Sequence, residues 1–205
     1  MNLEKYQQYS RIARGLEKAD LVLKNARIVN VFTEEIIRGD IAIQDGIIAG
    51  IGSFHGKEER DLAGRYVCPG FIDSHLHLES TLVTPAELVT VASRHGTTTF
   101  IVDPHESANV SGLAGIDYIL DQTEDVKANV YVMMPSCVPA TAIDDNGCTL
   151  TAEDMVPYLH NSRILGLGEV MDSISVVQGE KSMHDKLELF EGRIRDGHAP
   201  FLEEG

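Results

Sequence analysis

The stretch that decides the fold is PGFIDSHLHLES, residues 69–80. Its apolar start, Phe71-Ile72, gives way to two histidines spaced one residue apart, His75 and His77. Residues two apart on a regular strand point to the same face, so both imidazoles can bind one ion. Imidazole binds zinc, iron, manganese and nickel, and carboxylates nearby favour the harder of these metals. Taken alone, the pair is equally compatible with two surface histidines that are close by chance. The rest of the chain must decide between this interpretation and a metal site.

Composition and charge narrow the class of protein. The chain has 205 residues and 43% hydrophobic residues, enough to bury the core of one domain plus a small appendage. It has no apolar run long enough for a membrane span, and residues 1–20 lack the apolar segment of a secretory signal. A net charge of −15 disfavours nucleic acid as a partner. The three cysteines, Cys68, Cys137 and Cys148, form no CxxC pair, which favours a reducing compartment, the cytoplasm.

The pattern of expected secondary structure changes near residue 68. Residues 20–68 contain short β-rich segments with tight turns, and the Asp45-Gly46 pair predicts a hairpin. From Pro69 onward, strands, loops and helices alternate. We therefore expect an N-terminal helix and a β-domain segment over residues 1–68, and a second domain over residues 69–205.

The strands expected in the second region end at regular intervals. Neighbouring strand ends are 28 to 34 residues apart, the length of a βα unit, which predicts a parallel sheet. In a (β/α)8 barrel the chemistry takes place at the carboxyl ends of the strands. The predicted fold class is therefore α/β: the first four to five units of a partial (β/α)8 barrel, after a small β-rich segment. The strand ends are His75, Asp103, Pro135, Glu169 and His198. The last expected helix carries an apolar stripe of Met183, Leu187, Phe190 and Ile194.

Five blocks of the sequence resemble a known family. VCPGFIDSHLHLES (67–80) is similar to the first barrel strand of the amidohydrolase superfamily, which dihydroorotases and ureases share, so this element does not select a substrate. The other four blocks, in this order, resemble the bacterial adenine deaminases of that superfamily. They are GTTTFIVDPHESANVSG (96–112), PSCVPAT (135–141), LGLGEVMD (165–172) and DKLELFEGRIRDGHAP (185–200).

The resemblance implies a metal-dependent hydrolase that deaminates adenine to hypoxanthine and ammonia in purine salvage. It implies a binuclear site of divalent metal, Mn²⁺ or Fe²⁺, in the complete enzyme. His75 and His77 would hold the first ion, Glu169 would bridge both ions, and His198 would bind the second. Dihydroorotase-like and urease-like relatives use a carbamylated lysine as the bridge, whereas this chain has a glutamate. The alternative interpretation of Glu169 is an acid that caps a helix after a strand.

A second group of polar residues, Asp103, His105 and Glu106, follows the next strand as DPHE. Three interpretations stay open: the group shuttles protons or binds the base, it holds an accessory ion, or it caps the next helix. Glu79 is a candidate support for the metal ligands. No residue is assigned to a further cofactor. The remaining histidines are expected to face solvent: His55, His95, His160 and His184.

The length of the second region limits the prediction. A closed barrel has eight units and typically about 250 residues, more than residues 69–205 supply. The resemblance places a sixth-strand histidine and an eighth-strand aspartate beyond residue 205. We therefore expect a truncated form that needs the missing C-terminal barrel half and adenine as partners, with a homo-oligomer left open and no membrane partner. The alternatives are a non-catalytic fragment and an amidohydrolase that acts on another small cyclic amide or amidine.

Overall fold

The computed structural model describes residues 2–141 and 143–198. The chain divides into two compact units, Met1–Pro69 and Gly70–Gly205, and each is described by itself. Within the described ranges, no helix combines the length and the apolar character needed to cross a membrane. The sequence FLEEG at the end of the chain lies outside the described residues.

The first unit is a five-stranded sheet with one helix, α1 (Leu3–Ala13). The strand order is β3-β2-β1-β4, and β5 also pairs with β1. Asp45 and Gly46 have φ angles of +50° and +76° between antiparallel strands β2 and β3, so the predicted hairpin is confirmed. Ile12 of α1 packs into the core of this sheet with Val22 and Phe54. The strands are β1 (Ala19–Asn30), β2 (Glu35–Gln44), β3 (Ile47–Gly52), β4 (Gly56–Asp61) and β5 (Tyr66–Val67).

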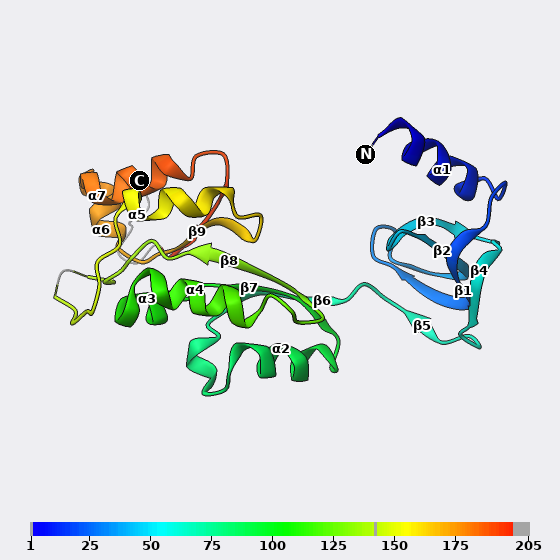
Figure 1. Cartoon of the computed structure of the whole chain (residues 1–205), viewed down its shortest axis with the longest axis horizontal. Coiled ribbons are helices and arrows are strands. Elements are labelled where there is room, and N and C mark those ends of the chain that lie inside the picture. The colour runs from blue at the N-terminus through cyan, green and yellow to red at the C-terminus, as the bar shows by residue number, and fades with distance from the viewer. Residues whose placement is uncertain (1, 142, 199–205) are drawn as a thin grey trace. The chain divides into compact units, whose positions relative to one another are not determined.

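The second unit contains a curled, parallel half-barrel sheet of five strands (Figure 1). The strand order is β10-β9-β8-β7-β6, and every neighbouring pair is parallel. Spatial order therefore follows chain order, and the predicted α/β partial barrel after a β-rich segment is confirmed. The strands are β6 (Phe71–Leu76), β7 (Thr97–Val102), β8 (Asn129–Met134), β9 (Ile164–Val170) and β10 (Ile194–Gly197).

The helices of the second unit pack against the sheet and form a common core with it. Phe100 of β7 and Leu167 of β9 are fully buried in one cluster with Ile116 and Phe190 from the helical layer. Proline at the first position of α2 favours the start of that helix, because its fixed φ suits the first helical turn. The helices are α2 (Pro85–Ser93), α3 (His105–Ser111), α4 (Leu113–Gln122), α5 (Ala152–Met155), α6 (Ser173–Gln178) and α7 (Lys181–Leu189), with short 3-10 turns at Glu79–Thr81 and Val156–His160.

One part of the sequence prediction is wrong. The last helix was expected to continue to Ile194, but α7 ends at Leu189 and Ile194 begins β10, where it is exposed. Gly192 has a φ of +78°, a left-handed conformation that turns the chain into the next strand. Helical spacing therefore continued by coincidence past the true end of the helix.

Candidate metal centre

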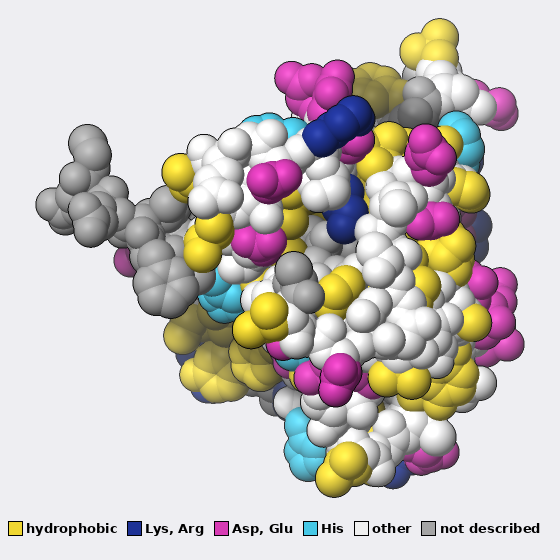
Figure 2. All heavy atoms as spheres, turned by 90° about the vertical axis from the view of Figure 1, so that its left-hand side faces the viewer, with side chains coloured by type: hydrophobic (Ala, Val, Ile, Leu, Met, Phe, Trp, Pro, Cys, Tyr) yellow, Lys and Arg dark blue, Asp and Glu magenta, His cyan; other side chains and the backbone are white. Residues whose placement is uncertain are grey.

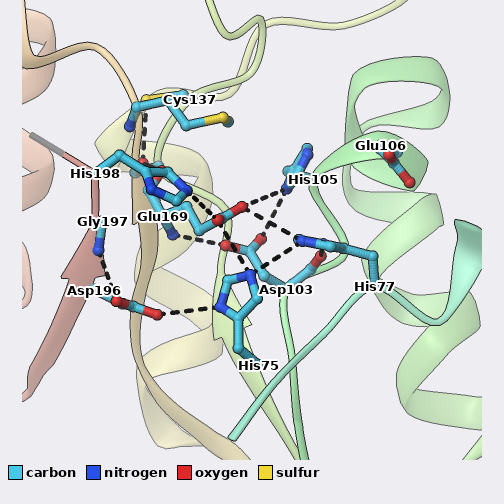
Figure 3. Close-up of polar contacts among 12 residues, drawn as sticks. His75, His77, Asp103, His105, Glu106, Cys137, Glu169, Asp196, Gly197 and His198 are labelled. Atoms are coloured by element: carbon cyan, nitrogen blue, oxygen red, sulfur yellow. Dashed lines mark hydrogen bonds and ion pairs between the residues drawn. The ribbon is translucent and has the colours of Figure 1, made fainter. Parts of the chain in front are cut away.

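In the described part of the chain, four histidines lie around the carboxylate of Glu169 at the carboxyl edge of the sheet (Figure 3). Glu169 Oε1 lies 3.1 Å from His75 Nε2 and 2.6 Å from His198 Nε2. Its other oxygen, Oε2, lies 3.6 Å from His77 Nε2, and the Nε2 atoms of His75 and His77 are 3.1 Å apart. The structure thus brings together the four residues predicted as metal ligands, although their role as ligands remains a prediction.

The other ring nitrogens of two histidines determine which atoms carry lone pairs. His77 Nδ1 lies 2.8 Å from the carbonyl oxygen of Asp103, which only accepts, so Nδ1 carries the proton in the neutral ring. His75 Nδ1 lies 3.3 Å from Asp196 Oδ2. This carboxylate oxygen likewise keeps the proton of the neutral ring on Nδ1. Both Nε2 atoms then point lone pairs at each other and at the carboxylate of Glu169. Such atoms repel one another unless a proton or a cation lies between them.

A second set of polar atoms adjoins the first. Asp103 is buried, and its Oδ2 accepts a 2.6 Å hydrogen bond from the Glu169 backbone N–H. His105 Nδ1 lies 3.6 Å from Asp103 Oδ1 and 3.4 Å from Glu169 Oε2. Within residues 2–141 and 143–198, Asp103 Oδ1 and His105 Nδ1 are buried without a hydrogen-bond partner. The Asp103 carboxylate raises the pKa of His105, although burial of the ring opposes this shift.

The two sets have the composition and spacing of metal ligands. His75, His77 and Glu169 form one group, and Asp103, His105 and Glu169 form the other, with the ligand atoms of each group within 4.8 Å of one another. Ligands at about 2.0–2.2 Å from one ion lie roughly 3–3.5 Å apart, close to the separations seen here. Imidazole and carboxylate ligands suit zinc, manganese and iron. These residues therefore fit divalent metal, and the shared Glu169 suits a bridge between two ions.

Glu106 and Glu79 lie at the edge of this centre. Glu106 is exposed, points away from the cluster and accepts a hydrogen bond from Ser80 Oγ (Figure 3). Glu79 Oε1 accepts hydrogen bonds from the backbone N–H groups of Glu106 (3.1 Å) and Ser107 (3.4 Å), and burial raises the pKa of Glu79. Glu79 therefore holds the first turn of α3, while Asp103 and His105, but not Glu106, join the cluster.

Sequence reasoning missed two residues that contact the candidate ligands. Asp196 lies beside His75, and Ser136 Oγ donates a 2.5 Å hydrogen bond to the carbonyl oxygen of Glu169. Both residues adjoin predicted strand ends, because Asp196 precedes His198 by two positions and Ser136 follows β8. Polar side chains within two residues of a strand end were the signal that could have found them.

The model of the amidohydrolase family matches residues 66–193. The chain belongs to the amidohydrolase family. The matched range contains every candidate ligand except His198, which follows it by five residues.

Two curated relatives of this amidohydrolase are named adenine deaminase. This chain is 57% identical to the adenine deaminase of Desulfitobacterium hafniense (strain Y51), over 100% of this chain and 36% of that protein. It is 49% identical to adenine deaminase 2 of Carboxydothermus hydrogenoformans, over 92% of this chain and 33% of that protein. A solved N-acyl-D-glutamate deacylase from Bordetella bronchiseptica, complexed with zinc and a phosphonate inhibitor, matches 58% of this chain and 30% of its own, with a TM-score of 0.43 and 24% identity. This amidohydrolase thus spans about a third of the length of the curated relatives that it matches.

Proposed function

We propose that this chain supplies the metal-binding part of an adenine deaminase, which hydrolyses adenine to hypoxanthine and ammonia. The observation that carries the proposal is the 57% identity to a relative of that name across the whole chain. The carboxylate of Glu169, which contacts His75, His77 and His198, agrees with a bridge that needs no carbamylated lysine. Free thiols at all three cysteines support a cytoplasmic setting.

In this proposal His75 and His77 hold one divalent ion, Glu169 is shared, and His198 serves the second ion, with Mn²⁺ or Fe²⁺ as the metal. Bound ions would supply hydroxide at neutral pH, because they lower the pKa of coordinated water to about 7. Asp196 and the carbonyl oxygen of Asp103 keep the ring protons of the histidine pair on Nδ1 and so present Nε2 to the metal.

The Asp103–His105 pair is suited to hold a proton for the departing amine nitrogen of the substrate. The pair is largely buried, and the Asp103 carboxylate raises the pKa of His105, so a proton is retained on the ring closer to neutral pH. An accessory ion held by Asp103, His105 and Glu169 is the alternative. Metal stoichiometry separates the two, because the accessory ion would be lost in a His105→Ala variant.

The metal centre is tested first, on the 205-residue chain. We expect Mn²⁺ at 100 times its dissociation constant to stabilise the wild type by about 2.7 kcal/mol, and to leave His75→Ala/His77→Ala unchanged. Elemental analysis and thermal unfolding with and without Mn²⁺ measure this. His95→Ala/His160→Ala, which removes two exposed histidines, is the matched control. Equal metal content in the wild type and the His75→Ala/His77→Ala variant would overturn the metal centre.

The activity is tested in a chimera that joins residues 1–198 to the remainder of the Desulfitobacterium hafniense relative. We expect ammonia release from adenine with added Mn²⁺, and a loss of more than about 100-fold in Glu169→Gln, because the shared ligand loses its charge. The 205-residue chain is assayed beside it, and we expect no detectable turnover, because barrel active sites draw residues from many strand ends. Turnover of other cyclic amides or amidines without turnover of adenine would overturn the substrate assignment.

A further inference from the structure

The backbone of Glu169 is held by side chains instead of a neighbouring strand. β8 ends at Met134, which pairs with Leu167, so Glu169 lies beyond the last backbone pairing with that strand. Its N–H donates to Asp103 Oδ2 at 2.6 Å, and its carbonyl oxygen accepts from Ser136 Oγ at 2.5 Å. The N–H and C=O of one strand residue point to the same side, so these two side chains replace the bonds that β8 no longer supplies. The candidate bridging residue therefore depends on the placement of Asp103 and Ser136.

A buried lysine holds Ser136 from its other side. Lys186 of α7 is 6% exposed, and its Nζ donates a 2.7 Å hydrogen bond to the carbonyl oxygen of Ser136. Burial lowers the pKa of Lys186. In the part of the chain that the structure describes, no carboxylate lies within 4 Å of this ammonium group. Burying a charge without a carboxylate partner costs free energy of folding. The hydrogen bond from Lys186 to Ser136 therefore calls for an explanation.

The surroundings of Lys186 offer carboxylates that it does not use. A hollow of about 640 Å³ beside it is lined by Asp172, Asp185 and Glu153, among other residues. Figure 2 shows acidic side chains near basic ones on this face. Asp185 instead pairs with Lys181 at 2.5 Å, and Asp172 caps α6. Lys186 is thus directed at the backbone behind Glu169 and not at the nearest surface acids.

We propose that Lys186 is a positioning residue for the metal centre: it fixes the backbone of Ser136, whose hydroxyl in turn fixes Glu169. This proposal rests on the metal centre proposed above. Charge alone predicts the opposite effect, because a nearby ammonium group repels a divalent cation and its removal would strengthen metal binding. Positioning predicts that removal weakens metal binding, so the sign of the change separates the two explanations.

The test uses the 205-residue chain with Lys186→Met, Ser136→Ala and the double variant. The matched control is Lys181→Met, which removes an exposed lysine from the same helix. Hydrogen exchange of the peptide over residues 164–172, measured without metal, is expected to speed up in the three test variants and not in the control. Co²⁺ affinity, measured by competition and by visible absorption, is expected to fall about tenfold in each single variant. The double variant is expected to fall no further, because both residues act through one connection.

Each outcome of these measurements either supports or overturns the proposed role of Lys186. Unchanged exchange over residues 164–172, or unchanged or tighter Co²⁺ binding in Lys186→Met, overturns the role of Lys186 alone. Failure of the wild type to bind Co²⁺ overturns the metal centre and this role together. If Lys186→Met does not fold, Lys186→Arg and Ser136→Ala decide: the arginine, which keeps a donor, is expected to retain Co²⁺ affinity, and the alanine is expected to lose it.

Discussion

Two buried carboxylates, one in each unit, have opposite surroundings. Asp40 of the first unit is 6% exposed and is saturated with donors: the Lys24 ammonium and the backbone N–H groups of Asn25 (3.1 Å) and Phe54 (3.2 Å). Burial by itself would raise the pKa of Asp40, but these three hydrogen bonds outweigh it and lower the pKa. Every partner of Asp40 is supplied by the fold, as in a structural ion pair.

Glu169 of the second unit contacts His198 Nε2 at 2.6 Å, but it also faces two ring nitrogens that carry lone pairs. Its oxygens lie against the Nε2 atoms of His75 and His77, whose protons are held on Nδ1. Asp103 Oδ1 and His105 Nδ1 lie 3.6 Å apart and lack a hydrogen-bond partner within the described residues. Native proteins pair most buried polar groups, so these atoms are consistent with the metal centre proposed above. Burial and charge are common to Asp40 and Glu169, whereas only Glu169 lies among several convergent ring nitrogens and carboxylate oxygens.

The largest expected effect concerns Asp40, the carboxylate whose partners all come from the fold. Asp40→Ala leaves Lys24 without its carboxylate, and we expect a loss of about 3 kcal/mol in the free energy of unfolding. Metal affinity should stay at the wild-type value, because the two units have separate cores. Urea denaturation and Co²⁺ titration measure the two quantities.

The control for Asp40→Ala is Glu58→Ala, which removes one member of the exposed Arg60–Glu58 pair. No measurable change in stability is expected there, since exposed ion pairs contribute little. A loss below about 1 kcal/mol in Asp40→Ala would remove the contrast between the two carboxylates.

The next effect tests the unmatched atoms of the site. Asp103→Asn keeps an oxygen for the Glu169 N–H and adds an amide donor beside the unpartnered His105 Nδ1. We expect metal affinity to fall about tenfold, or about 1.4 kcal/mol, while stability without metal stays constant or rises. Competition titration with Co²⁺ and thermal unfolding in the presence of a chelator provide the two readings.

An exposed aspartate serves as the control for Asp103→Asn. Asp121→Asn should leave both quantities unchanged, because Asp121 lies on the surface of α4. If Asp103→Asn destabilised the protein as much as Asp40→Ala and bound metal normally, Asp103 would be a structural acid, and the argument from unpaired atoms would fail.

The sequence was sufficient to predict the parallel βα units and the site residues that lie within a motif. Regular spacing of strand ends predicts parallel βα units, because each unit must cross the sheet and return to the same edge. His75 and His77 are two residues apart on one strand, so their convergence follows from local geometry. The boundary at Ile194 could not be predicted from periodicity, since a positive φ at Gly192 ends the helical run.

Residues that act through three-dimensional contacts were harder to find. Lys186 looks like any helix lysine in the sequence, yet it lies three residues after Met183 and four before Phe190, on the buried stripe of α7. A lysine on an apolar stripe is therefore a signal that deserves a search for its acceptor. That the acceptor is the carbonyl oxygen of Ser136 depends on how α7 lies against the segment that follows β8, which no local pattern specifies.

The smallest expected effect concerns pH. The pKa of Asp40 is lower in the folded protein than its unfolded value of about 3.9, so its stabilising contribution is present above that pH and is lost as pH falls through the folded pKa. Asp40→Asn has no such titration. We expect the stability difference between the wild type and Asp40→Asn to shrink below about pH 4, by no more than about 1.4 kcal/mol for each pH unit. Urea denaturation of both proteins between pH 6 and about pH 3 measures the difference.

Only the difference between the two proteins is informative, because Asp20, Glu59 and Asp61 also have lowered pKa values and titrate in both. Glu58→Gln, which removes an exposed acid, should run parallel to the wild type over the same range. His105 has a raised pKa, so its contribution has the opposite sign: it is present below its unfolded pKa of about 6.5 and is lost as pH rises through the folded value. Parallel curves for the wild type and Asp40→Asn would mean that Asp40 gains nothing from its three donors, and the contrast with Glu169 would then rest on geometry alone.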